Sequence, residues 1–286
     1  MMSGPKAARE LIAFYLDAGV DALVGEEPIN RMAEDIAPQR LGAAPAPGSE
    51  NKTARRVRGQ SPPAGATSPA APQMPELPAA PPSPEAAVMA AREAARTATT
   101  LDELQALLTA FEGCALRATA TQLVFADGNP QSRVMFVGEA PGYDEDIVGR
   151  PFVGRSGKLL DLMMAAIGLD RTSSYIANVV PWRPPGNRTP TPQETAICLP
   201  FIRRQIELAD PDVLVCLGKP SAQTLLNISD GLLKSRGRWY TFQTGKREIR
   251  ATVTMHPAYL LRQPLQKRFA WRDFLALKKA LAGGRG

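Results

Sequence analysis

The stretch VMFVGEAPGYDED (residues 134–146) decides the fold. It opens with a short apolar run, as a buried strand does, and ends in a loop rich in glycine and acidic residues. Further apolar runs lie at residues 175–180, 213–217 and 249–254, and helix-like segments separate them. Strands alternating with helices in this way are typical of a parallel sheet covered on both faces. We therefore expect a three-layer α/β/α sandwich around a central four-stranded parallel sheet.

The segments around these strands have the apolar spacing of helices. Apolar residues recur every three or four positions, so each helix would present one apolar face to the sheet. Thr100, with an acidic residue three positions later, has the pattern of a helix start. The expected helices cover residues 87–98, 157–167, 192–208, 221–226 and 268–281, together with one that opens at Thr100.

The first 85 residues differ in composition from the rest of the chain. Residues 1–36 include apolar side chains at helical spacing and predict a helical segment. Residues 37–85 hold 12 of the 27 prolines and almost no large apolar side chain. Such a segment cannot bury enough surface to offset the entropy of the chain, so we expect a disordered linker. The domain that contains the sheet would then cover residues 86–286.

Charge and cysteine content narrow the classes of function. The formal net charge is +6 and the isoelectric point is near 9.4, which suits a nucleic-acid partner without proving one. The three cysteines are too few and too scattered for a disulfide framework, so we expect a protein of the reducing cytoplasm. No signal-peptide core and no apolar run of membrane length occurs, so we expect no membrane partner.

Polar residues gather where the expected strands end. Parallel sheets bind their ligands beyond the carboxyl ends of the strands, because the loops there meet at one edge. The first loop lacks the lysine and hydroxyl residues of a phosphate-binding loop, and its acidic residues suit water activation or a cationic transition state. Phe152, set between proline and glycines, would either present its ring to a planar ligand or fill the core. The residues expected at this edge are Glu139, Glu145, Asn178, Lys219 and His256, the chain's single histidine.

Five motifs together resemble the signatures of the family 4 (type-4) uracil-DNA glycosylases, bacterial members included. The resemblance runs from about Phe111 to Phe274 and does not cover residues 1–85. No motif would suffice alone, but the set, in this order and at compatible spacing, is highly specific. The motifs are GEAPG (138–142), ED (145–146), GRPFVG (149–154), RPPGNR (183–188) and HPAYLLR (256–262).

The resemblance implies an enzyme that hydrolyses the N-glycosidic bond of a flipped-out deoxyuridine in DNA, releasing uracil and leaving an abasic site. Phe152 would stack on the uracil beside Ala140, and Asn178 would read its polar edge. Glu139 and Glu145 would share the work of stabilising the cationic sugar and orienting the water. His256 would donate a hydrogen bond to the uracil oxygen that becomes negative.

The resemblance also implies contacts to the rest of the DNA. Related glycosylases insert a segment like Leu260–Arg262 into the duplex at the vacated position. The alternative for Leu260 and Leu261 is that they begin the next buried element. The candidate phosphate contacts are Arg183, Arg188, Lys219, Arg262, Lys267 and Arg268.

The chain departs from the family at its metal cofactor. The family typically carries a [4Fe–4S] cluster on four cysteines, and the corresponding positions here are Phe111, Cys114, Trp182 and Cys198. Phenylalanine and tryptophan cannot supply the thiolate ligands that such a cluster needs. We therefore expect the cluster to be absent, with the two aromatic side chains filling its volume and the two cysteines buried as small apolar residues. No other cofactor is expected.

Two other functions stay open at this point. The chain could be a uracil-DNA binding protein that has lost turnover or traps its substrate covalently through His256. A relative that crosslinks to DNA carries a basic insertion before its histidine segment, and no clear counterpart is present here, which favours turnover. The other alternative is an unrelated nucleotide hydrolase. The expected partners are uracil-containing DNA, single- or double-stranded, and a repair protein for residues 1–36. We expect a monomer associated with the nucleoid.

Overall fold

The computed structural model describes residues 83–283. The helical segment predicted in residues 1–36 and nearly all of the predicted linker lie outside the described residues. The first described helix, α2, begins at Pro84, with the Ser83 hydroxyl accepting a hydrogen bond from the Ala86 amide. Within residues 83–283, no helix is both long and apolar enough to cross a membrane.

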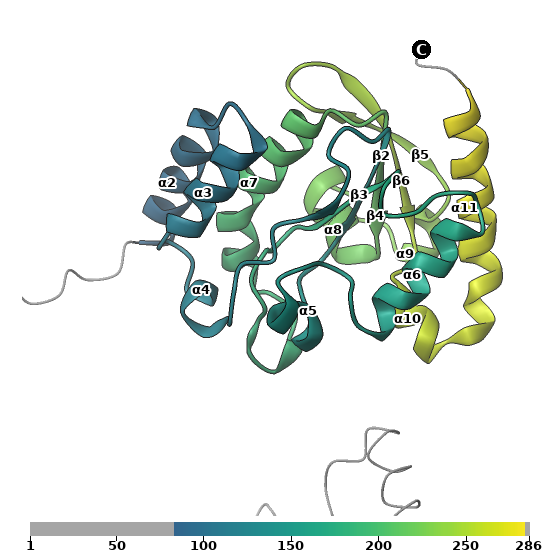
Figure 1. Cartoon of the computed structure of the whole chain (residues 1–286), viewed down its shortest axis with the longest axis horizontal. Coiled ribbons are helices and arrows are strands. Elements are labelled where there is room, and N and C mark those ends of the chain that lie inside the picture. Colours follow the sequence, from purple (N-terminus) through teal and green to yellow (C-terminus); the bar gives the residue numbers. More distant parts are fainter. Residues whose placement is uncertain (1–82, 284–286) are drawn as a thin grey trace, which may run out of the picture. The chain divides into compact units, whose positions relative to one another are not determined.

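A six-stranded sheet with the order β1-β3-β2-β4-β6-β5 forms the centre of this domain (Figure 1). The four central strands are parallel, as the sequence predicts. The two edge strands are antiparallel to their neighbours and were not predicted. The strands are β1 Asp127–Gly128, β2 Val134–Gly138, β3 Tyr175–Asn178, β4 Val213–Leu217, β5 Trp239–Gln243 and β6 Glu248–Thr254.

Helices cover both faces of the sheet, so the three-layer sandwich is confirmed (Figure 1). The long helices begin and end within three residues of the predicted limits. They are α2 Pro84–Thr97, α3 Leu101–Ala110, α6 Arg155–Ala165, α7 Pro192–Ala209, α8 Lys219–Leu226 and α11 Lys267–Ala282. Short helices not predicted from the sequence are α4 Leu116–Thr119, α5 Tyr143–Val148, α9 Leu232–Ser235 and α10 Pro257–Arg262, with 3₁₀ turns at Pro185–Asn187 and Pro264–Gln266.

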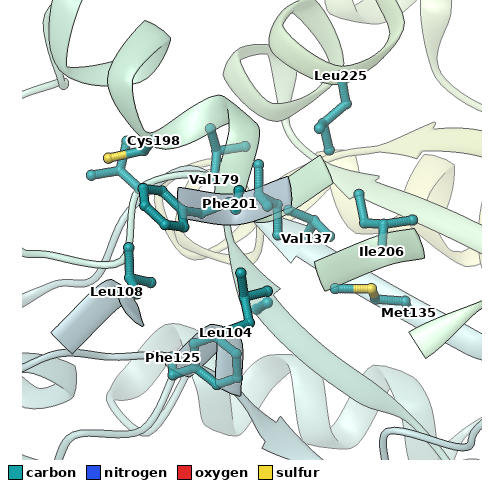
Figure 2. Close-up of a cluster of buried hydrophobic side chains, with 14 of the residues drawn as sticks. Leu104, Leu108, Phe125, Met135, Val137, Val179, Cys198, Phe201, Ile206 and Leu225 are labelled. Carbon is teal, nitrogen blue, oxygen red and sulfur yellow. The ribbon is translucent and has the colours of Figure 1, made fainter. Parts of the chain in front are cut away.

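Alternate residues of β2 build the two halves of the core. Met135 and Val137 lie in one apolar cluster with side chains from α3, α7 and α8, such as Phe201 (Figure 2). Val134 and Phe136 lie in the other cluster, with side chains from α6 and α11. All five residues of β2 are buried, as expected of a strand covered on both faces.

The register of the parallel strands brings their carboxyl ends to one line. Gly138 at the end of β2 pairs with Asn178 at the end of β3, and Leu217 of β4 pairs with Thr254 of β6. The loops that follow these strands therefore leave the sheet at the same edge, which is where a ligand site is expected in this architecture.

A buried ion pair between Arg236 and Asp273 lies beside β6 and α11. It contacts β6 at Thr254, two residues before His256. Asp273 on α11 accepts hydrogen bonds from the Thr254 hydroxyl at 2.8 Å and from Arg236 Nε at 3.0 Å. Burial raises the pKa of the Asp273 carboxyl even though Arg236 and Thr254 act in the opposite direction. Removing one partner of such a pair leaves a buried charge without compensation.

We expect Asp273→Asn to lower the free energy of unfolding by about 3 kcal/mol, because Arg236 then keeps an unpaired buried charge. Chemical denaturation followed by circular dichroism measures this change. Glu93→Gln is the matched control, since it breaks the solvent-exposed Glu93–Arg96 pair and is expected to leave the midpoint unchanged. Equal midpoints for both variants would show that the Asp273 pair adds nothing to stability.

Candidate functional site

A cavity of about 600 Å³ opens at the carboxyl edge of the sheet. It brings together nine of the residues expected to act in the site. These are Glu139, Ala140, Glu145, Phe152, Asn178, Arg188, Lys219, His256 and Arg262. The four central strands and the loops after them thus contribute to one concave site, as the strand order expected from the sequence predicts. The lining also includes Asn187 and Tyr259, which lie within two of the motifs, and Ser156 and Leu232, which no motif contains.

Glu145 joins the two loops that frame this cavity. Its side chain is buried, at 7% exposed. One carboxylate oxygen accepts hydrogen bonds from the amides of Val153 and Gly154 at 3.1 and 3.0 Å, and the other accepts one from the Gly142 amide at 3.1 Å. The loop after β2 and the loop before α6 are therefore held together by one side chain.

Glu139 differs from Glu145 in its surroundings. It lines the cavity and is half-buried, and its Oε1 is buried without a hydrogen-bond partner among residues 83–283. Burial raises the pKa of the Glu139 carboxyl. A carboxylate with a free oxygen and a raised pKa is a better proton acceptor than an ordinary one, because its basicity is closer to the working pH.

Phe152 is held in a backbone conformation that residues with side chains rarely adopt. Its φ angle is 56°, and its ring is 4% exposed. Arg171 donates hydrogen bonds to the carbonyls of Pro151, at 3.1 Å, and of Phe152. A Cβ atom on Gly157 would come within 1.7 Å of the Phe152 carbonyl oxygen, and one on Gly138 within 2.7 Å of the ring. The two glycines are therefore required where they stand.

Phe152 answers both sequence expectations, since it packs in the core and also faces the cavity. Its ring centroid lies 5.5 Å from that of His256, with an interplanar angle of 33°. Asn178, at the end of β3, also lines the cavity, and its buried Oδ1 has no hydrogen-bond partner within the described part of the chain. An unpaired buried amide oxygen is costly, so this atom is poised for a ligand donor.

His256 caps α10 with its side chain. Its Nδ1 accepts a hydrogen bond from the Ala258 amide at 3.1 Å, so the proton of the neutral ring lies on Nε2. Burial, aided by the positive charge of Arg262, lowers the pKa of His256 to about 4. The imidazole is therefore neutral at pH 7 and has one N–H to donate.

The basic residues fall into two groups. Arg188 forms an ion pair with Glu194 at 2.6 Å, and Arg183 Nε donates to Asn187 Oδ1 at 2.7 Å, so both are engaged within the protein. Lys219 and Arg262 are exposed at the cavity. Lys267 and Arg268 are exposed at the start of α11, outside the cavity lining.

The segment expected to wedge into DNA is only partly at the surface. Leu260 is 1% exposed and packs in an apolar cluster with Met255 and Ala270, so its predicted DNA contact is wrong. Helix α10 turns this side chain toward α6 and α11, which is the alternative considered from the sequence. Leu261, on the outer side of the same helix, is 36% exposed and remains available.

Comparison with known proteins identifies the family. Residues 125–276 match the model of the uracil DNA glycosylase superfamily. A type-4 uracil-DNA glycosylase of Archaeoglobus fulgidus is 39% identical over 179 residues, which cover 61% of this chain and 90% of the relative. Another, from Thermotoga maritima, is 46% identical over 153 residues, or 52% and 77% of the two chains.

The chain belongs to the type-4 uracil-DNA glycosylases. The family resemblance drawn from the five motifs is thereby confirmed, and an unrelated nucleotide hydrolase is set aside. The region matched by the family model contains every residue that lines the cavity.

The positions of the type-4 cluster cysteines do not fit a four-thiolate cluster in this chain. Trp182 is buried, and Phe111 packs edge-on against Phe201 with ring centroids 5.1 Å apart. The ring of Phe111 also folds over Gly113, where a Cβ atom would lie 2.5 Å from it. Among residues 83–283, no group of three or more His, Cys, Asp or Glu side chains is arranged to hold a metal ion.

The two remaining cysteines at these positions are buried and interact with one another. The contact between the Cys114 and Cys198 thiols, together with burial, raises the pKa of Cys198 well above its usual range, while the same contact lowers the pKa of Cys114. Figure 2 shows Cys198 among apolar side chains of the core. Cys216, in β4, is buried elsewhere in the core, and burial raises its pKa to about 12.

The neutral state of His256 can be measured directly, because the untagged chain contains no other histidine. We expect its NMR titration midpoint near pH 4. The unfolded chain takes up this proton first, near pH 6.5, so the His256 contribution to the free energy of unfolding is present above pH 6.5 and declines as the pH falls toward 4. A midpoint at or above 6.5 would contradict the desolvated, neutral imidazole described here.

Proposed function

We propose that this protein hydrolyses the N-glycosidic bond of deoxyuridine flipped out of DNA, releasing uracil and leaving an abasic site. The observation that carries the proposal is the meeting of Phe152, Asn178, Glu139 and His256 in one cavity. Family membership supports the same reaction, since the relatives are named type-4 uracil-DNA glycosylases. The cavity volume, about 600 Å³, is ample for a nucleoside.

The base would be bound by stacking and by its polar edge. Phe152 offers a ring that is already fixed, so little conformational entropy is lost when a planar base stacks on it. The unpartnered Oδ1 of Asn178 would accept a hydrogen bond from the uracil N–H, and its amide nitrogen would donate to a uracil oxygen. Ala140 adds a small apolar contact at the cavity wall.

Cleavage separates charge, and the two polar groups suit the two charges. When the C1′–N1 bond breaks, its electron pair leaves with uracil and the sugar becomes cationic. The neutral His256 would donate its Nε2 hydrogen bond to the uracil oxygen that gains negative charge. Glu139 would stabilise the cationic sugar and accept a proton from the water whose oxygen bonds to C1′.

Glu145, which the sequence paired with Glu139, would act by positioning. Its two oxygens already accept three backbone hydrogen bonds, so it holds the loops of Glu139 and Phe152 rather than the substrate. The exposed cations Lys219, Arg262 and Lys267 would contact DNA phosphates without sequence preference, and Leu261 would enter the space that the uracil leaves.

We further propose that the enzyme works as a monomer and without an iron–sulfur cluster. The aromatic residues Phe111 and Trp182 stand at two of the four cluster positions and pack against the apolar core, and this burial of apolar surface adds stability there. The domain of residues 86–286 would carry the activity, and residues 1–36 would recruit a repair protein. Pull-down with a peptide of residues 1–36 tests that recruitment.

The two catalytic assignments are tested by excision from uracil-containing oligonucleotides. His256→Ala is expected to lower kcat by on the order of 10²–10³-fold, because a preorganised donor to the developing oxyanion is lost. DNA affinity measured by anisotropy should stay within about twofold, with Glu93→Gln as an unaffected control variant. Unchanged kcat would remove His256 from the mechanism. A wild-type protein that binds uracil-DNA, or links to it covalently, without releasing uracil would overturn turnover itself.

Replacing each glutamate by glutamine should change the thermal midpoint of unfolding in opposite directions. Glu139→Gln is expected to lower kcat by about 10²-fold or more while raising the thermal midpoint at pH 8. The midpoint rises because the pKa of Glu139 is raised in the folded protein. The wild type therefore loses stability as the pH rises through that pKa, whereas glutamine does not ionise and loses none. Glu145→Gln should instead lower the midpoint. One of the two oxygens that accept backbone hydrogen bonds becomes an NH₂ group, which is a donor and faces a backbone N–H. The reverse pattern would exchange their roles.

The cofactor proposal is tested by iron analysis and visible absorption of anaerobically purified protein. We expect iron far below one atom per chain and no absorbance shoulder, because two of the four ligand positions carry no thiol. The double variant Phe111→Cys/Trp182→Cys restores four cysteines and serves as the control that iron uptake is detectable. Stoichiometric iron in the wild type would contradict the proposal.

A further inference from the structure

An exposed aromatic ring follows a cavity-lining glycine along the chain and has no part in the chemistry above. Tyr143 is the first residue of α5 and follows Gly142, which lines the cavity. It is 59% exposed. Ile147, one helical turn further on, is 50% exposed and continues the apolar surface along the helix. Figure 1 shows α5 and α10 along the same edge of the domain.

A fixed guanidinium group supports one face of this ring. The Cζ atom of Arg183 lies 5.0 Å from the centroid of Tyr143, within the range of a cation–π contact. Arg183 is itself held by Asn187, at 2.7 Å, and lies 3.8 Å from the buried carboxylate of Asp146. Asp146 in turn accepts hydrogen bonds from the amide and hydroxyl of Thr121, each at 2.9 Å. The ring therefore rests on a rigid, charged support.

We propose that Tyr143, backed by Arg183, is a stacking subsite for the nucleobase next to the flipped uracil, and that it favours single-stranded DNA. This inference rests on the proposed function. Aromatic side chains with a cation nearby bind bases of any sequence through stacking, which is the usual way in which single strands are held. Because Gly142 and Asn187 flank this pair and both line the cavity, the subsite adjoins the place of the uracil.

The strand preference follows from the availability of the neighbouring base. In a single strand, that base is free to leave its neighbours and lie on the ring. In a duplex it is paired and stacked, so it would have to pay the cost of unpairing before it could reach Tyr143. The ring therefore adds to the binding of single strands far more than to that of duplexes.

The first arm of the test compares excision from a short single-stranded oligonucleotide with one central deoxyuridine and from the same strand in a duplex. We expect Tyr143→Ala to raise KM about tenfold on the single strand, as loss of one stacked base predicts, with kcat and the duplex KM within about twofold. Tyr143→Phe should keep the wild-type KM. Met89→Ala, on α2 and 60% exposed, is the control for loss of an exposed apolar side chain.

The second arm removes the partner instead of the ring. Two oligonucleotides carry a base-free sugar, one on the 5′ side and one on the 3′ side of the deoxyuridine. We expect only one of them to raise the wild-type KM about tenfold, and we expect neither to raise the KM of Tyr143→Ala any further. A loss of fold would instead lower kcat on every substrate. The subsite would be overturned if the missing base raised KM equally in wild type and Tyr143→Ala. It would also be overturned if Tyr143→Ala left KM unchanged, and either result would favour a protein-binding role for this surface.

The two proposals fail in different ways. Wild-type excision with no effect of Tyr143→Ala sinks the stacking subsite alone. If the wild type excises no uracil, the proposed function fails, and anisotropy of the same oligonucleotides with wild type and Tyr143→Ala still measures the subsite. Tenfold weaker binding by the variant would then support it, and equal binding would overturn it.

Discussion

The carboxylate of Glu145 accepts hydrogen bonds from the amides of Gly142, Val153 and Gly154, and the site depends on these three bonds. They join the loop that carries Glu139 to the loop that carries Phe152. Without them, the residue assigned to the water and the residue assigned to the base would belong to two independent loops. Because the bonds are buried and made to a charged acceptor, they are among the stronger hydrogen bonds that a protein forms.

A second carboxylate extends this connection away from the cavity. Asp146, the next residue, binds Thr121 and lies close to Arg183. Arg183 follows Trp182, one of the two aromatic residues at the cluster position. The packed aromatic region and the edge that carries the cavity are therefore neighbours along the chain and through side chains. Apolar packing and a buried carboxylate thus support the loops on this side of the cavity.

Much of the fold could be predicted from the sequence, because the four central strands are continuous apolar runs. The edge strands could not be predicted. Strand β1 has two residues, and β5 mixes half-buried, exposed and buried residues without regular alternation. The motifs located the residues that line the cavity, but not what each one touches. Motif spacing does not show that the carboxylate of Glu145 accepts backbone hydrogen bonds whereas Glu139 has an oxygen without a partner. It also does not separate the buried Leu260 from the exposed Leu261. Both differences arise from packing in the folded chain. The Gly-Asn turn at Asn187, whose backbone is left-handed, indicates a tight turn but not the hydrogen bond to Arg183.

The left-handed backbone of Phe152 has a consequence for selection at neighbouring positions. A side-chain-bearing residue in this region costs about 1–3 kcal/mol, which the surrounding contacts must offset. The contacts come from Arg171, nineteen residues away, and from the bare backbone of Gly157. Neither residue lines the cavity, yet both act on the Phe152 carbonyl. A substitution at Arg171 or Gly157 would therefore disturb the position of the Phe152 ring, although both positions lie outside the cavity lining.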